Sequence, residues 1–209
     1  MQDRIVRHAG LDRLNHWLIA VCVLVLLATA FLPILGVEFA WLAIHWWTGF
    51  ILIAAVGFHI LRALFVRRLG RIWISRRDLA QALAIVGRTL RRSRAPIPLS
   101  GKYSFAQKFI HLAFGVVVLS SIASGSLMMV KIDTPWWDRN PYWLSDSAWG
   151  AVYVVHGLAA LLLITMVMSH VYFALRPEKA MFLRSMFLGW ITRDEFRRNH
   201  DPERWQVER

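Results

Sequence analysis

Cysteine is almost absent from this sequence: Cys22 is the only one among 209 residues. A single thiol cannot form an internal disulfide, a cysteine-based zinc site or a self-contained iron–sulfur cluster. Cys22 lies inside a long apolar run, and we interpret it as a small, buried hydrophobic side chain. A nucleophile–base set, a phosphate-binding loop and a metal-hydrolase motif are also missing, which indicates that the chain has no substrate-oxidising site of its own.

Acidic residues are scarce as well, with 13 Asp and Glu against 25 Lys and Arg, and the net charge is +12 although 57% of the residues are hydrophobic. Four stretches carry almost no charge and have the length, roughly 20 residues, that a helix needs to cross a bilayer core. They cover about residues 14–35, 41–65, 107–130 and 149–175. We therefore predict an all-α integral membrane protein, a four-transmembrane-helix bundle in which residues 1–209 form one membrane domain with a polar tail at 176–209.

The basic residues are distributed unevenly between the connections. Of the 25, 23 lie in the N-terminal segment, in the long connection between the second and third spans, and in the tail; the exceptions are Lys131 and Arg139. Because positive residues stay in the cytoplasm, we expect both termini and the long connection there. Anionic lipid headgroups are the expected partner of these arginines, and nucleic acid is not.

The long connection contains the stretch "RIWISRRDLAQALAIVGRTLRR", whose apolar residues recur at helical spacing. This pattern predicts an amphipathic helix that lies on the membrane surface. The third span is rich in small residues, which we interpret as helix-packing positions. They are Ser120, Ser121, Ser124, Gly125 and Ser126.

Six of the eight histidines fall inside the predicted spans, whereas His8 and His200 lie outside them and need no functional explanation. Ionisable residues in membrane spans are expensive and are functional candidates by default. His156 and His170 are fourteen residues apart, about 3.9 helical turns, so they share a face and lie roughly 21 Å apart along the axis. That distance is too long for one metal ion but suits two planar cofactors at two depths, and two b-type haems are the natural candidates.

Depth in the membrane indicates how these histidines would pair. His45 and His156 lie near the outer ends of the second and fourth spans, so they predict an outer haem site. His170 lies near the inner face, where its partner is either His16 or His59. Spacing favours His59, because it follows His45 by the same fourteen residues, but spacing alone leaves both alternatives open. Glycines near the outer histidines, Gly49 and Gly157, would leave room for a porphyrin.

Several motifs resemble the gamma subunit of respiratory formate dehydrogenases, a four-helix, di-haem cytochrome b. They are "DRLNHW" in the first span, "IHWWTGF" in the second, "VHG" and "MSH" in the fourth, "GKYSFAQK" before the third, and the tail "SMFLGWITRDEFRRNHDPERW". The resemblance covers nearly the whole chain. It implies four axial ligands to haem iron, namely His16, His45, His156 and His170, and leaves His59 as the alternative inner ligand.

The resemblance also implies a quinone pocket beside the inner haem. Its candidate residues are Tyr103, Ser104, Ala106, Gln107 and His111. The family pattern would have Asn and Gly where this chain has Ser104 and Ala106, although a serine can still donate a hydrogen bond to a quinone carbonyl. Candidates for haem packing or for binding the propionates are Arg13, Gly49, Arg62 and Gly157.

The function implied by the resemblance is that of a membrane anchor in the bacterial inner membrane. Such a subunit carries electrons from an iron–sulfur subunit, which is fed by a catalytic molybdenum or tungsten subunit, through two b haems to quinone, and the complex can form a higher oligomer. The span motifs are shared with hydrogenase b-type cytochromes and stand-alone cytochrome b561-like quinol oxidoreductases, which are the alternatives. A structural anchor or a transporter, with histidines paired to polar groups, is the competing hypothesis from a different class.

Overall fold

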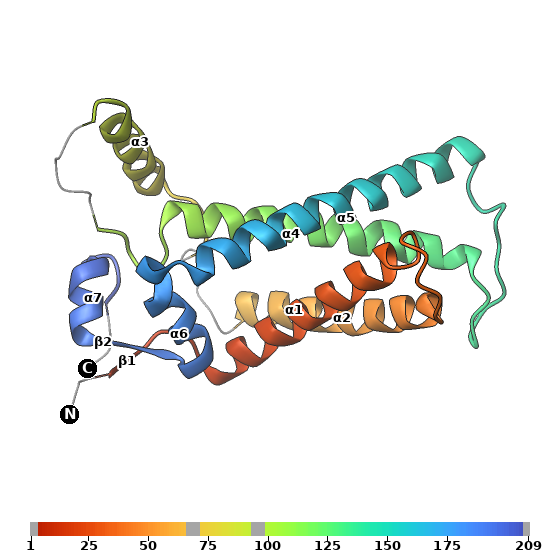
Figure 1. Cartoon of the computed structure of the whole chain (residues 1–209), viewed down its shortest axis with the longest axis horizontal. Helices are drawn as coiled ribbons and strands as arrows, with labels where there is room; N and C mark the ends of the chain where they lie inside the picture. The colour runs from red at the N-terminus through yellow and green to blue at the C-terminus, as the bar shows by residue number, and fades with distance from the viewer. Residues whose placement is uncertain (1–3, 66–71, 93–98, 207–209) are drawn as a thin grey trace. The chain divides into compact units, whose positions relative to one another are not determined.

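The structure is a computed structural model that describes residues 4–65, 72–92 and 99–206 (Figure 1). Four long helices dominate this part of the chain: α1 (Gly10–Phe31), α2 (Trp41–Phe65), α4 (Phe105–Met128) and α5 (Asp146–Leu175). Each is long and apolar enough to cross a membrane. The prediction of a mainly helical chain with four membrane-spanning helices is thereby confirmed.

The ends of these helices are set by local chemistry. α1 stops at Phe31, four residues before the predicted end of the span, because Pro33 has no N–H to continue the helical ladder. The chain turns there, and Gly36 has a positive φ of 86°. α4 begins after Ser104, which forms a capping pair with Gln107: the Ser104 N–H donates to Gln107 Oε1 (2.9 Å), and the Gln107 N–H donates to Ser104 Oγ (3.3 Å).

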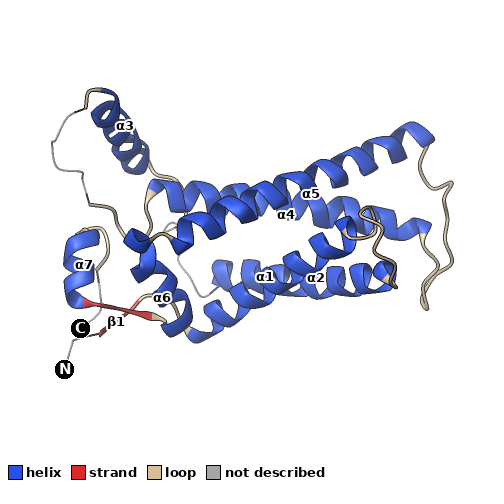
Figure 2. Ribbon diagram, viewed as in Figure 1, coloured by secondary structure: helices blue, strands red, loops and turns tan. Residues whose placement is uncertain are grey.

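The chain divides into two compact units, with the boundaries inside the four long helices. One unit, which we call the bundle, comprises Leu14–Ile60 and Phe114–Phe173. The other, which we call the sheet unit, comprises Met1–Arg13, Leu61–Ala113 and Ala174–Arg209. Figure 2 shows that the bundle is built of helices and that both strands belong to the sheet unit.

The bundle has a small core and a large apolar surface. Its core cluster takes residues from all four helices: Cys22, Val23, Leu52, Val118 and Leu163. Many other large apolar side chains point outward; Val116 is 66% and Met168 68% exposed. Such a surface would be a liability in water, but it is what a helix needs when lipid surrounds it.

The sheet unit is held together by a short antiparallel sheet and its own core. β1 (Arg4–Val6) pairs with β2 (Trp190–Thr192), so that Ile5 lies opposite Ile191. Phe196 and Trp205 complete this core. The 3-10 turn η3 (Pro177–Lys179) and two short helices, α6 (Ala180–Leu188) and α7 (Arg193–Asn199), flank β2 in the sequence, and a further 3-10 turn, η2 (Met129–Lys131), follows α4 in the bundle.

Gly189 joins α6 to β2 at a position that only glycine fits. Its φ is 86°, and a Cβ there would lie 3.0 Å from the His8 carbonyl oxygen. The Gly189 carbonyl accepts the backbone N–H groups of Arg7 (2.8 Å) and His8 (3.0 Å). The N-terminal strand is thus bonded to the tail at the point where α6 ends.

The predicted amphipathic helix is present as α3 (Arg76–Leu90) in the sheet unit. It begins with a capping box in which the Asp78 N–H donates to Ser75 Oγ and Asp78 accepts the Ser75 N–H. Its buried residues are polar, namely Asp78 and Gln81, while its large apolar residues are exposed. That it lies on a membrane surface remains a prediction.

Candidate functional site: two facing pairs of histidines

Two pairs of imidazole rings face each other inside the bundle. α1 and α5 bring His16 and His170 together with ring centroids 6.4 Å apart, and α2 and α5 bring His45 and His156 to 6.2 Å. We call His45–His156 the outer pair and His16–His170 the inner pair, after the membrane sides on which the sequence predicts them. α5 supplies one histidine to each pair because the two residues are four turns apart on one face.

Apolar core residues of α5 and α2 lie beyond the outer pair on the way to the inner pair. Leu163 is seven residues from both His156 and His170, and Leu52 is seven residues after His45. Both leucines belong to the bundle core. Seven residues correspond to about 10 Å of helix, so the two pairs are too far apart to bind one metal ion together. Each pair is therefore a separate site.

The geometry of each pair fits a metal ion held between two imidazoles. With metal–nitrogen bonds of about 2 Å on both sides, the ring centroids must be about 6 Å apart. Among the described residues no group of three or more His, Cys, Asp or Glu could hold a metal ion. Two imidazoles are too few for a stand-alone site, whereas a porphyrin supplies the remaining four nitrogens, so the donor set fits a haem with two axial histidines.

Space near the outer pair is compatible with a planar ring. A Cβ added at Gly49 or at Gly157 would meet no atom within 4 Å. Gly125 is different, because a Cβ there would lie 3.1 Å from His156 Cε1. Gly125, predicted from the sequence only as a helix-packing position, thus also contacts the imidazole.

Each histidine also has a neighbour that fixes its ring. Thr29 Oγ1 lies 2.8 Å from His45 Nδ1, and Ser124 Oγ lies 3.0 Å from His156 Nδ1. The two hydroxyl residues are only 3% and 4% exposed. The inner-pair rings have aromatic neighbours instead: Trp17 lies edge-on to His16 (5.5 Å), and Phe114 lies edge-on to His170 (5.7 Å). The sequence analysis did not single out Thr29, because a threonine in an apolar helix has no distinguishing pattern.

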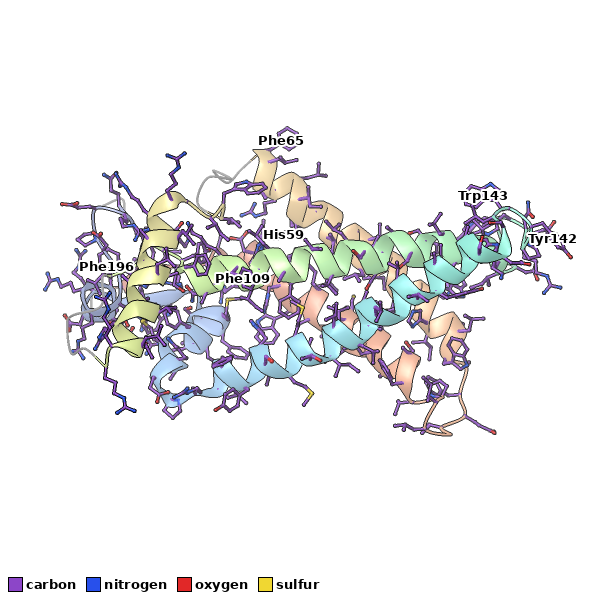
Figure 3. All side chains as sticks on the ribbon, turned by 90° about the horizontal axis from the view of Figure 1, so that it is seen from above. His59, Phe65, Phe109, Tyr142, Trp143 and Phe196 are labelled. Atoms are coloured by element: carbon purple, nitrogen blue, oxygen red, sulfur yellow. The ribbon has the colours of Figure 1, made fainter. Side chains whose placement is uncertain are left out.

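His59, the alternative inner ligand, belongs to the last part of α2 in the bundle and is labelled in Figure 3. The ring of His16 faces that of His170. This is the arrangement that the resemblance implies, and His59 stays the alternative that spacing favours.

The residues predicted to line a quinone pocket lie in the sheet unit. Ser104 and Gln107 form the capping pair of α4, so part of their hydrogen-bonding capacity is used by the helix end. Tyr103 is half-buried beneath the Arg7 guanidinium, whose carbon lies 5.7 Å from the ring centroid. Ala106 and His111 are exposed.

The two arginines suggested as propionate partners both have partners in the protein. Arg62 Nε donates to Asp12 Oδ1 at 2.7 Å, which forms an ion pair between α1 and α2. Arg13 Nη1 donates to the Phe187 carbonyl. These contacts hold both arginines at the beginning of α1 and the end of α2, and their role as propionate partners stays a prediction.

His200, which the sequence analysis set aside, is one of the most buried residues, with 1% exposure. Its Nε2 accepts a hydrogen bond from Arg7 Nη1 (2.8 Å), so its Nδ1 carries the proton and donates to the Gly101 carbonyl (2.8 Å). Burial, reinforced by the Arg7 charge, lowers the pKa of His200 to about 4. Burial also lowers the pKa of Arg7 to about 10. No local motif marks a histidine that pairs with an arginine 193 positions away.

Four apolar helices and two facing histidine pairs define a multi-pass membrane protein of the b-type cytochrome class. The chain belongs to the prokaryotic cytochrome b561 family, whose model matches residues 7–189. Membership of this family implies a b-type haem.

Curated relatives confirm the resemblance found in the sequence motifs. The chain is 28% identical to the formate dehydrogenase cytochrome b556(fdo) subunit of Escherichia coli K12, over 99% of this chain and 94% of the relative. It is 24% identical to the formate dehydrogenase cytochrome b556 subunit of Haemophilus influenzae, over 98% of this chain and 83% of that relative.

Proposed function

We propose that this chain is the di-haem b subunit of a formate dehydrogenase-like complex in the bacterial inner membrane. In that role it carries electrons from a partner iron–sulfur subunit, itself fed by a catalytic molybdenum or tungsten subunit, to membrane quinone. The observation that supports this most strongly is the pair of imidazole–imidazole spacings, 6.2 and 6.4 Å, at two levels of one bundle.

The histidines, the core leucines and the apolar surface of the bundle have separate roles in this function. His45 and His156 would hold one haem, and His16 and His170 the other; each haem supplies a one-electron redox level when bound. The core leucines between the pairs exclude water and keep the dielectric low. The apolar outer surface keeps the four helices in lipid, where an electron carrier must lie to meet quinone.

A haem count tests the proposal directly. The full-length chain, purified from membranes in detergent, should contain two b haems and show a b-type band in the reduced-minus-oxidised spectrum. His45→Ala and His156→Ala should each lose one haem, and His16→Ala and His170→Ala the other. His59→Ala should keep both. Loss of a haem in His59→Ala but not in His16→Ala would contradict the ligand assignment, and a wild-type chain without a b-type band would contradict the function.

The partner is tested by copurification. A tagged chain should bring down an iron–sulfur subunit and a molybdenum- or tungsten-containing subunit, and formate should reduce its haems. A nickel-containing partner would favour the hydrogenase alternative, and haem reduction by quinol without a partner would favour a stand-alone cytochrome b561-like oxidoreductase.

The quinone site is proposed at the beginning of α4, at Tyr103, Ser104, Ala106, Gln107 and His111. Ser104 keeps its hydroxyl proton while its oxygen accepts from the Gln107 N–H, so it can still donate to a carbonyl. Ser104→Ala should weaken quinone reduction while the haem spectrum stays unchanged. An unchanged rate would remove Ser104 from the site.

A further inference from the structure

The two hydroxyls of the bundle that contact the outer pair share one geometry. Thr29 Oγ1 donates to the Val25 carbonyl (2.9 Å) and also lies 3.0 Å from the Leu26 carbonyl. Ser124 Oγ donates to the Ser120 carbonyl (2.7 Å). A hydroxyl has a single proton, and in both residues the helix backbone takes it.

The direction of the second hydrogen bond follows from this. With the hydroxyl proton directed to a helix carbonyl, Thr29 Oγ1 accepts from His45 Nδ1 and Ser124 Oγ accepts from His156 Nδ1, which is the direction required if each ring binds a metal through Nε2. Both imidazoles are then Nδ1–H tautomers, and the lone pair of each lies on Nε2. That is the nitrogen that a metal ligand requires.

Both hydroxyls lie in the interior of the bundle. Thr29 and Ser124 are 3% and 4% exposed, so both hydroxyls lie away from water. Gly125 leaves just enough room for the same ring, since a Cβ there would lie 3.1 Å from His156 Cε1. Ser124 and Gly125 together therefore fix both the tautomer and the rotation of that ring.

We propose that Thr29 and Ser124 are positioning residues that lock the outer-pair histidines as Nδ1–H tautomers and set the redox potential of the outer site alone. The inference rests on the proposed function, because it concerns the haem that His45 and His156 would hold. An acceptor on Nδ1–H makes the imidazole a stronger donor to the metal, which favours the oxidised state. Removal of the hydroxyl should therefore raise the outer midpoint potential, while the inner pair, with its aromatic neighbours, stays unchanged.

The test is a redox titration of the full-length chain in membranes, with the outer transition assigned as the one lost in His156→Ala. Thr29→Val and Ser124→Ala remove the acceptor. At the wild-type outer midpoint, each should increase the ratio of reduced to oxidised outer haem about two- to tenfold, the range expected for one hydrogen bond. The low-spin electron paramagnetic resonance signal of the outer haem should shift as the ring loosens.

Matched controls separate this role from a general effect on packing. Thr29→Ser and Ser124→Thr keep the hydroxyl and should restore the wild-type potential. Thr165→Val and Ser120→Ala remove hydroxyls that likewise donate to their own helix, to the Leu161 and Val116 carbonyls. Both should leave the outer potential unchanged.

The outcomes distinguish the two proposals. A wild-type chain without b haem overturns the proposed function. A wild-type chain with two haems, whose potentials and resonance signals do not move in Thr29→Val and Ser124→Ala, overturns the positioning role. Equal shifts of both haems, or equal behaviour of Thr29→Ser and Thr29→Val, also overturn it. Ser124→Ala deletes one atom from a different helix and tests the inference independently of Thr29.

Discussion

His200 illustrates how burial changes the chemistry of one residue. Its ordinary pKa of 6.5 falls to about 4, because the ring is buried and faces the Arg7 guanidinium. The neutral ring accepts from Arg7 and donates to Gly101, and it thereby joins the N-terminal segment, the stretch before α4 and the tail. Protonation of His200 Nε2 would remove the lone pair that accepts from Arg7. It would also place a second positive charge beside the Arg7 guanidinium in a buried environment.

This lowered pKa predicts a pH dependence for the sheet unit. Between about pH 6.5 and pH 4 the unfolded chain binds a proton at His200 that the folded chain does not, so stability decreases as the pH falls through this window, by up to about 3 kcal/mol. The protection factors of the β1 and β2 amides, corrected for the slower intrinsic exchange at low pH, should fall accordingly. In His200→Gln, whose amide can make both hydrogen bonds but does not titrate, this acid sensitivity should decrease; an unchanged pH profile would contradict the prediction.

Gly125 gives a second prediction for a single residue. Gly125→Ala places a methyl group against His156 and should rotate that ring, so we expect an altered spectrum or partial loss of one haem. Gly115→Ala in the same helix is the control, because its Cβ meets no atom within 4 Å. Haem content and spectra measure both variants. Identical behaviour of the two would show that the close contact is unimportant.

In α3 the polar face is buried and the apolar face is exposed, which is the reverse of a helix in a water-soluble protein. Asp78 is buried and accepts from Lys108 Nζ and Arg204 Nη2, both at 2.7 Å. Burial opposes the charge on Asp78, but the hydrogen bonds from Lys108 and Ser75 outweigh it and lower its pKa to about 2. The polar face is therefore held by contacts within the sheet unit, and the apolar face is exposed at the protein surface.

Removal of the Asp78 charge should release this helix. Asp78→Asn leaves two cations without their shared anion, which costs about 3 kcal/mol when the pair is buried. We expect amide exchange in α3 to increase strongly. Asp133→Asn is the matched control, because its ion pair with Arg139 is 3.6 Å long and both side chains are about two-thirds exposed. Equal protection of α3 in both variants would contradict the role of the cluster.

The exposed apolar face of α3 predicts contact with lipid. Leu79, Leu83, Val86 and Leu90 share one face and are 49–79% exposed. A spin label at Leu83→Cys, in a Cys22→Ala background, should collide more often with oxygen than with a polar nickel reagent. A label at the exposed Ala84, on a different face, should show the opposite preference. Equal accessibilities at the two positions would place α3 away from the bilayer.

At the scale of the whole molecule, charge predicts the topology. The segments that carry 23 of the 25 basic residues should all be cytoplasmic. A green fluorescent protein fused after residue 209 should be fluorescent, and alkaline phosphatase inserted between α4 and α5, where Figure 3 labels Tyr142 and Trp143, should be active. The opposite pattern would invert the protein in the membrane and exchange the outer and inner pairs.

The sequence by itself determined the number of spans, their approximate limits and the four-turn separation of His156 from His170. These properties follow from one-dimensional patterns, because a bilayer demands a fixed apolar length and an α-helix repeats every 3.6 residues. The tertiary structure decided which ring faces His170, because the rotation of each helix depends on packing around residues such as Leu163. It also decided that Thr29 contacts His45 and that His200 is buried against Arg7. Such contacts join distant positions, and no local pattern of residues encodes them.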